Sequence, residues 1–295
     1  LTLEPNALTA AKEQQRSLAL TAGPGAGKTE MLAQKADFLL RTGVCHYPKR
    51  ILAISFKKDA SSNLKERVQL RCGSKLSQRF DSFTFHAFAK RIIDKYRVLL
   101  TDSDELEPNY SVGMKRIHKK QIDFDSLVPF ALQIINSSSI VRSSILQTYS
   151  DVFLDEFQDC TDKQYELIKA IFFNSNIKLT AVGDTKQKIM GWAGALEGIF
   201  LNFTADFNAH PLNMYRNFRS KPKLLRLQNE IIRNLDPNSL MAEDLIVGNQ
   251  GFILHESFNS SSDEAEHLSN LIQTWIIEEH IPPSEIAILV SKQIE

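Results

Sequence analysis

Short apolar runs alternate along the chain with longer stretches in which apolar residues recur at helical spacing. The runs SLALTAG, ILAISF, DVFLDE and IKLTAVGD predict buried strands, at residues 17–23, 51–56, 151–156 and 177–184. The helical spacing lies at residues 29–43, 59–71 and 83–96. Strands that alternate with helices predict an α/β fold, in which a parallel sheet carries helices on both faces.

The last third of the chain begins a second alternation of the same kind. Two apolar runs, at residues 251–258 and 285–290, predict strands, and the amphipathic stretch 264–280 between them predicts a helix. A further helix is expected at residues 223–235. We therefore expect the start of a second α/β unit.

This pattern predicts two domains. Residues 1–203 are expected to form the first, with a surface insertion at residues 98–122, which are polar and poorly periodic. Residues 204–295 are expected to supply linker helices and the first part of a second domain that is truncated. Ligands of such folds bind at the carboxyl ends of the parallel strands, so the loops that follow strands are the candidates for function.

Charge is balanced over the whole chain but unevenly distributed. Lys and Arg number 35, as do Asp and Glu. Residues 1–150 are net basic, and residues 151–295 are net acidic. This asymmetry is consistent with a basic face that meets a polyanion such as nucleic acid, and equally with an ordinary solvated surface.

Cysteine usage and hydropathy indicate the compartment. Cys45, Cys72 and Cys160 are odd in number and form no CxxC pair, which argues against a disulfide framework or a zinc site. No apolar run approaches the ~18 residues of a membrane span, and the first residues lack the pattern of a secretory signal. We expect a cytoplasmic protein without a membrane partner.

The loop after the first predicted strand carries candidate chemistry. Its sequence AGPGAGKT fits the pattern [AG]xxxxGK[ST] between a strand and a helix, which is the context of a phosphate-binding P-loop. Lys28 is expected to reach the β and γ phosphates, and Thr29 to hold Mg²⁺. The expected nucleotide-binding residues are Ala22, Gly23, Pro24, Gly25, Ala26, Gly27, Lys28, Thr29 and Glu30.

An acidic strand end supplies the second part of such a site. In VFLDEFQD, Asp155 ends an apolar run and can bind Mg²⁺, directly or through water. Glu156 is placed to polarise the attacking water as a general base. Together the two motifs predict an enzyme that hydrolyses a nucleoside triphosphate, with a P-loop NTPase fold.

Further motifs, in the same order, resemble the UvrD/Rep/PcrA-like family of superfamily 1 DNA helicases, in its N-terminal part. AGPGAGKT and DVFLDEFQD resemble the family's motifs I and II, and AVGDTKQKIMGWAGA resembles motif III. NFRS is similar to the NYRS of motif IV. The segments ILAISFKKDASSNLKERV, FTFHAFAKRII and DFDSL are similar to motif Ia, to the T-x-H-x-F element and to a segment before motif II.

This resemblance implies a RecA-like domain, ATP and Mg²⁺ as cofactors, and roles for further residues. Gln187 would link the γ-phosphate to DNA, and Arg219 would contact the γ-phosphate from motif IV. The implied catalytic residues are Glu156, Lys28, Gln187 and Arg219, with Thr29 and Asp155 on the metal. The implied DNA-binding residues are Phe56, Lys57, Thr84, His86, Phe88 and Trp192.

Several of these residues also have a purely structural interpretation. Trp192 could belong to the core instead of stacking on an unpaired base. His86 could be a buried structural histidine, and Arg219 could form a surface salt bridge. The residues themselves leave these alternatives open.

The function that the resemblance implies is an ATP-dependent single-stranded DNA translocase or helicase with 3′–5′ movement. Its substrate would be single-stranded DNA or a 3′-tailed duplex. The alternative is a nucleotide-gated DNA sensor or regulatory subunit that works with a nuclease or repair protein and unwinds little. A P-loop kinase or GTPase is a third class, which the order of the helicase motifs and the lack of an NKxD guanine motif disfavour.

The chain departs from the family pattern in several places. The family's upstream glutamine, which reads adenine, is replaced by Pro5 according to the motif or by Asn6 according to spacing. Motif III has Met190 and Ala193 where the family usually has Tyr and Arg. The insertion is far shorter than the family's helical subdomain, and motifs V and VI do not occur. We therefore expect weak hydrolysis by this chain alone and leave duplex unwinding open.

Overall fold

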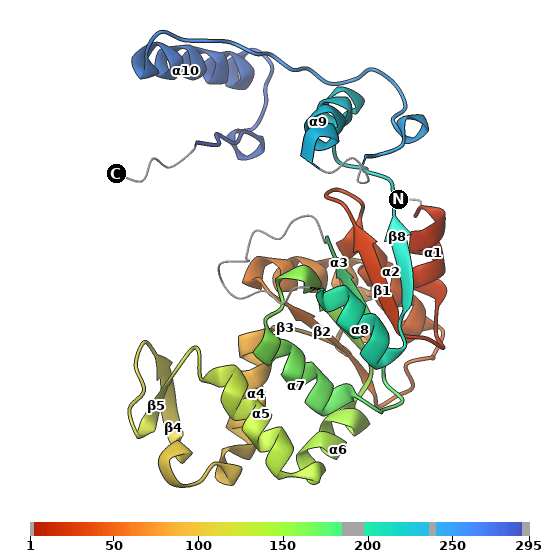
Figure 1. Cartoon of the computed structure of the whole chain (residues 1–295), viewed down its shortest axis with the longest axis vertical. Helices are drawn as coiled ribbons and strands as arrows, with labels where there is room; N and C mark the ends of the chain where they lie inside the picture. The colour runs from red at the N-terminus through yellow and green to blue at the C-terminus, as the bar shows by residue number, and fades with distance from the viewer. Residues whose placement is uncertain (1–2, 185–197, 236–239, 291–295) are drawn as a thin grey trace.

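A six-stranded parallel sheet forms the centre of the structure. The structure is a computed structural model and describes residues 3–184, 198–235 and 240–290. The strand order is β3-β2-β6-β7-β1-β8, and every pairing in this sheet is parallel (Figure 1). The bounds are β1 Leu18–Ala22, β2 Arg50–Ser55, β3 Phe80–Thr84, β6 Tyr149–Asp155, β7 Lys178–Gly183 and β8 His210–Met214.

Helices cover both faces of this sheet. One face carries α1 (Pro5–Lys12), α2 (Lys28–Arg41) and α3 (Lys58–Ser77). The other face carries α4 (Phe85–Tyr96), α5 (Leu127–Ser137), α6 (Ser139–Thr148), α7 (Asp162–Phe172) and α8 (Ile199–Phe207). Successive strand residues point to opposite faces, so Phe153 packs in the first core and its neighbours Val152 and Leu154 pack in the second. Because both faces are covered, the four central strands β2, β6, β7 and β1 are mostly buried and apolar, whereas the edge strands β3 and β8 are more exposed and more polar.

The α/β fold predicted from the sequence is confirmed. The four predicted strands correspond to β1, β2, β6 and β7. β3 and β8 were not predicted from the sequence, because they carry polar residues or Pro211 and are ordered only by pairing with a neighbouring strand. Since β8 pairs with β1, the first α/β unit extends to Met214, beyond the boundary drawn at residue 203.

The insertion in the first unit is a small two-stranded sheet. It consists of β4 (Leu106–Gly113) and β5 (Lys119–Asp123). Ile122 is fully buried in the core beside α4 and α5, and the Tyr110 hydroxyl donates to Asp94 Oδ1 of α4 at 2.6 Å. The insertion is therefore anchored to the first unit.

The described residues after β8 form two α-helices and pack little. α9 (Pro222–Leu235) and α10 (Ser261–Ile277) confirm the two helices predicted there. The expected strands at residues 251–258 and 285–290 do not form, and Leu289 is 96% exposed. A strand needs a neighbour to pair its backbone groups, and neither segment has one among the described residues. In the ranges that the structure describes, no helix combines the length and apolarity of a membrane span.

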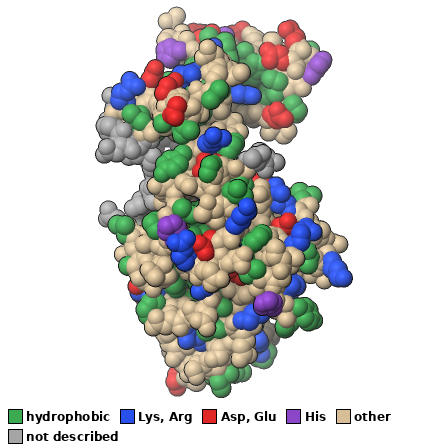
Figure 2. Space-filling view, turned by 90° about the vertical axis from the view of Figure 1, so that its right-hand side faces the viewer, with side chains coloured by type: hydrophobic (Ala, Val, Ile, Leu, Met, Phe, Trp, Pro, Cys, Tyr) green, Lys and Arg blue, Asp and Glu red, His purple; other side chains and the backbone are tan. Residues whose placement is uncertain are grey.

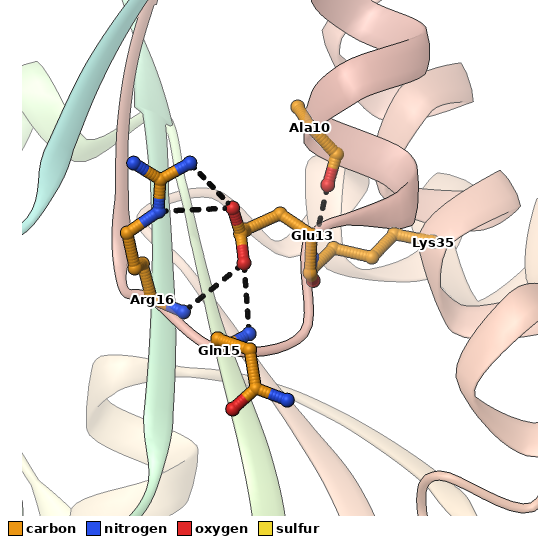
Figure 3. Close-up of polar contacts among 5 residues, drawn as sticks. All are labelled: Ala10, Glu13, Gln15, Arg16 and Lys35. Carbon is orange, nitrogen blue, oxygen red and sulfur yellow. Dashed lines mark hydrogen bonds and ion pairs between the residues drawn. The ribbon is translucent and has the colours of Figure 1, made fainter.

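Helix α1 is fixed to α2 by a buried lysine of α2. Lys35 is only 2% exposed, and its ammonium donates to the carbonyls of Ala10 at 2.9 Å and of Glu13 at 2.5 Å (Figure 3). Both carbonyls lie at the C-terminal end of α1, where helix carbonyls lack partners. Burial lowers the pKa of Lys35 to about 8, although Asp151 and Glu13 partly offset this.

We predict that Lys35 makes stability depend on pH in the alkaline range. The usual pKa of 10.5 applies to the unfolded chain, so between about pH 8 and 10.5 the unfolded state holds a proton that the folded state has lost. The free energy of unfolding therefore rises with pH in this window. Between pH 7.5 and 9.5, the free energy of unfolding measured by urea denaturation should rise by about 2 kcal/mol more in the wild type than in Lys35→Met. Lys12→Met, at an exposed position of α1, is the control; equal pH slopes in all three proteins would contradict the prediction.

Candidate active site

The glycine loop between β1 and α2 has the geometry of a phosphate cradle. Gly25 and Gly27 adopt left-handed backbone angles, with φ of 72° and 84°, which residues with a Cβ rarely adopt. Gly27 stands at the N-cap of α2, so the free N–H groups and the positive end of the helix face the loop. The Lys28 ammonium donates to the carbonyls of Ala22 at 3.2 Å and Gly23 at 3.5 Å, and is thus held at the loop.

A cavity of about 340 Å³ opens beside this loop. Its walls come from α1, the glycine loop, α2, α3, the end of β6 and the segment after β8. The lining residues are Leu3, Glu4, Ala7, Pro24, Gly25, Ala26, Gly27, Lys28, Thr29, Glu30, Arg67, Glu156, Phe218 and Arg219. Three of the predicted catalytic residues, Lys28, Glu156 and Arg219, therefore lie around one cavity.

The acidic strand end contributes to the wall of this cavity. Asp155 is the last residue of β6, and its pKa is raised to about 7 by burial and by the neighbouring charge of Glu156. Glu156 has a left-handed φ of 50°, a conformation that a non-glycine residue adopts only when its surroundings enforce it. This turn brings Glu156, but not Asp155, to the cavity wall.

Gln158, which sequence analysis gave no role, fixes the orientation of Glu156. Its Nε2 donates to Glu156 Oε2 at 2.9 Å, and its Oε1 accepts from the backbone N–H of Asp184 at 2.9 Å. Gln158 thus connects the acidic end of β6 to the end of β7. A Cβ at Gly183 would clash with Gln158 Oε1, so glycine is required there for this connection.

The oxygen donors at this edge fit a magnesium ion that is shared with phosphates. Thr29 offers a hydroxyl, and Asp155 offers a buried carboxyl whose pKa is raised by burial and by the charge of Glu156, against the opposing effect of Lys28. Hard oxygen donors are those that Mg²⁺ prefers. Among the described residues no cluster of three His, Cys, Asp or Glu could hold a metal alone, so the remaining ligands would have to be phosphate oxygens and water.

The segment after β8 lies directly on the glycine loop. The Phe218 N–H donates to the Gly25 carbonyl at 2.9 Å. Asn217 Oδ1 accepts from the N–H groups of Arg219 at 2.8 Å and Ser220 at 2.9 Å, which shapes the turn that carries Arg219. A Cβ at Gly25 would lie 2.5 Å from Asn217 Oδ1 and 2.7 Å from Arg219 Cβ. Gly25 is therefore needed both for the loop and for this contact.

The α1 side of the cavity contains neither of the residues that the sequence places at the position of the family's adenine-reading glutamine. Neither Pro5 nor Asn6 lines the cavity, and Asn6 Nδ2 instead donates to the Asn213 carbonyl at 2.7 Å. Leu3, Glu4 and Ala7 form this wall. Leu3 and Ala7 have no side-chain hydrogen-bonding group, so they cannot replace the glutamine of the family pattern.

The predicted DNA-binding residues are distributed over two neighbouring strand ends. Phe56 and Lys57 follow β2, and Thr84 ends β3, where its side chain accepts from Ala87 N at 3.2 Å and caps α4. His86 is half-buried, its pKa is lowered by burial against the opposing effect of Asp125, and its ring packs edge-on to Phe124.

Phe88 is 2% exposed and packs in the core. It lines a different cavity, of about 560 Å³, between α4 and α6. A DNA-binding role for Phe88 stays a prediction that this burial does not support. Gln187 and Trp192 lie outside the described residues. On the face shown in Figure 2, Lys and Arg lie scattered among uncharged and acidic side chains and form no continuous basic patch there.

The parallel sheet, the glycine loop with Lys28, and the acidic end of β6 together define a P-loop NTPase fold. Comparison with known proteins identifies the family. The chain belongs to the UvrD/REP helicase N-terminal domain family, whose model matches residues 3–115 and 109–208. The resemblance predicted from the motifs is confirmed.

The curated relatives that the chain resembles are considerably longer. "ATP-dependent DNA helicase PcrA" of Leuconostoc citreum is 25% identical over 92% of this chain and 44% of its own length. The protein of the same name from Bacillus subtilis is 27% identical over 79% of this chain and 39% of its own. The first of these matches runs over 337 positions although this chain has 295 residues, so that relative contains segments that this chain lacks.

The solved structures found to be similar are distant. A Pif1 helicase from Candida albicans has a TM-score of 0.45 and 14% identity, covering 79% of this chain and 44% of its own. Against the curated relatives above, the chain spans less than half of their length.

We predict that Gly25→Ala disrupts the contact between the glycine loop and the segment after β8. The alanine would be strained by the left-handed φ and would clash with Asn217 and Arg219. Gly43→Ala is a matched control, because Gly43 also has a positive φ of 77° but a Cβ there would have nothing within 4 Å. The control should lose only about 1–2 kcal/mol of stability. Gly25→Ala should in addition lose at least about tenfold in affinity for a fluorescent adenine nucleotide; equal affinities in the two variants would contradict this explanation.

Proposed function

We propose that the chain hydrolyses ATP to drive 3′–5′ translocation along single-stranded DNA. The observation that carries this proposal is that Lys28, Glu156 and Arg219, from three separate parts of the chain, line one cavity beside the glycine loop. Membership of the helicase family supports DNA as the substrate, since the matched relatives are named as ATP-dependent DNA helicases.

Each of the three residues has a chemical task in this proposal. Lys28 neutralises the β and γ phosphates, while Glu156, held by Gln158, accepts a proton from the attacking water. Arg219 stabilises the charge that spreads over the transferred phosphoryl group. Thr29 and Asp155 would hold Mg²⁺, which supplies further charge neutralisation.

DNA is proposed to pass over the ends of β2 and β3. Phe56 and Lys57 follow β2, and Thr84 and His86 lie at the junction of β3 and α4, at the same edge of the sheet as the nucleotide cavity. A lysine suits a phosphate and an aromatic ring suits a base. The proximity of the two sites would allow hydrolysis to alter DNA contact.

The C-terminal residues are proposed to begin a second RecA-like unit. Support comes from the amphipathic helix α10, which has no buried residue, and from the exposed apolar residues of segments 251–258 and 285–290. Such surfaces are typical of elements that pack against others of a larger unit. Nucleotide-dependent movement of this unit would then be transmitted through the segment after β8.

The small insertion favours a second candidate function. Short 3₁₀ turns and the two-stranded sheet of β4 and β5 stand between α4 and α5, in place of the family's larger subdomain. A nucleotide-gated DNA sensor or regulatory subunit, acting with a nuclease or repair protein, would need no element that engages duplex DNA. Its signature would be binding of ATP and DNA with little turnover.

We predict that Glu156→Gln leaves ATP affinity unchanged within about twofold and lowers kcat at least about 100-fold, because the variant keeps its size but loses the base. Hydrolysis is measured by phosphate release from the full chain, with and without single-stranded DNA. Glu166→Gln on the surface of α7, where Glu166 pairs with Lys163, is the matched control.

Two results separate the candidate functions. A DNA-dependent rise in hydrolysis that Glu156→Gln removes would support the motor. DNA binding without such a rise would support the sensor. Full hydrolysis by Glu156→Gln would show that the general base is assigned to the wrong residue.

A further inference from the structure

The Glu4 carboxylate accepts hydrogen bonds from a distant segment of the chain instead of capping its own helix. Glu4 stands at the N-cap of α1 and is 4% exposed, yet it makes no capping hydrogen bond to its own helix. The carboxylate instead accepts from the backbone N–H of Tyr215, at 3.1 and 3.2 Å, and from the N–H of Arg216, at 2.8 Å. These donors are more than 200 residues away in the chain, in the segment that follows β8.

This contact is energetically favourable and specific. A buried carboxylate needs hydrogen-bond donors, and bonds from N–H groups to a charged acceptor are stronger than those between neutral groups. The positive end of α1 also favours a negative charge at this position. Asn6 of the same helix holds the Asn213 carbonyl, so α1 fixes the segment 213–216 at three backbone positions.

The fixed segment continues directly to the nucleotide cavity. Two residues beyond Arg216, the Phe218 N–H binds the Gly25 carbonyl, and Arg219 then lines the cavity together with Lys28. The opposite end of α1 is held by Lys35 of α2, the helix that begins at Lys28 (Figure 3). Helix α1 is therefore a rigid link between the phosphate-loop helix and the segment that carries Arg219.

We propose that Glu4 is a positioning residue that fixes the backbone before Arg219, and thereby sets the preference of the site for a nucleoside triphosphate over a diphosphate. The inference rests on the proposed contact between Arg219 and the γ-phosphate. Only the γ-phosphate distinguishes the two ligands, so a displaced Arg219 loses triphosphate affinity and leaves diphosphate affinity intact. If Glu4 had only a structural role, its replacement would weaken the binding of both ligands equally.

The test compares the Kd values of Mg²⁺·AMP-PNP and Mg²⁺·ADP in the full chain by calorimetry. Glu4→Ala should lower the ratio of the ADP Kd to the AMP-PNP Kd about tenfold, because the Tyr215 and Arg216 N–H groups lose a charged acceptor. The ratio is the readout because Glu4 itself lines the cavity. Glu4→Gln keeps one carbonyl acceptor, so its triphosphate preference should lie between those of the wild type and Glu4→Ala. It also provides the test if the alanine variant does not fold.

Glu13→Gln is the matched control. Glu13 lies just past the other end of α1, and its carboxylate likewise accepts backbone N–H groups, those of Gln15 at 2.8 Å and Arg16 at 3.2 Å (Figure 3). Its replacement should leave the triphosphate preference unchanged, even if it lowers the melting temperature.

Arg219→Ala separates the role of Glu4 from that of Arg219 itself. If this variant loses the triphosphate preference while both Glu4 variants keep it, the inference about Glu4 is wrong and the role of Arg219 stands. If Arg219→Ala also keeps the preference, both the role of Arg219 and that of Glu4 are wrong. If the Glu4 variants bind ADP and AMP-PNP with equally weakened affinity, Glu4 has only a structural role and the inference is wrong.

Discussion

The parallel pairing of β1 with both β7 and β8 is the constraint on which the candidate site depends. Thr21 lies in register with Gly183 and Asn213, so the glycine loop, the end of β7 and the segment after β8 leave the sheet at one edge. β6 pairs with β7 on the far side and brings Asp155 and Glu156 to the same edge. Groups that are far apart in the chain thus meet without any long side chain having to reach across the fold.

Two buried side chains at this edge are tied to distant backbone positions. Gln158 links Glu156 to the N–H of Asp184, and Glu4 links α1 to the N–H groups that precede Arg219. Buried polar groups are costly unless they are satisfied, so these bonds also exclude alternative arrangements of the loops. The stability of the first unit and the geometry of the nucleotide site therefore rest on the same contacts.

The periphery of the molecule contrasts with this edge. The insertion consists of short 3₁₀ turns and the strands β4 and β5, and it is attached to α4 through Tyr110 and Asp94. The C-terminal helix α10 buries no side chain, and the apolar segments beside it are unpaired in the described part of the chain. The described part of the candidate site is thus held by several specific contacts, whereas the described insertion is small and the described C-terminal segments are unpaired.

The sequence by itself determined the α/β class, the central strands, the glycine loop and the acidic end of β6, because these depend on local periodicity and on residues adjacent in the chain. It could not determine β3, β8 or α1, because these elements form only through pairing and packing with distant segments. The motif around Arg219 was recognisable in sequence, but its contact with the glycine loop was decided by the placement of β8 beside β1. The roles of Gln158 and Glu4 were decided only by the tertiary structure, since a glutamine or a glutamate in a sequence does not reveal which distant backbone N–H its side chain will meet.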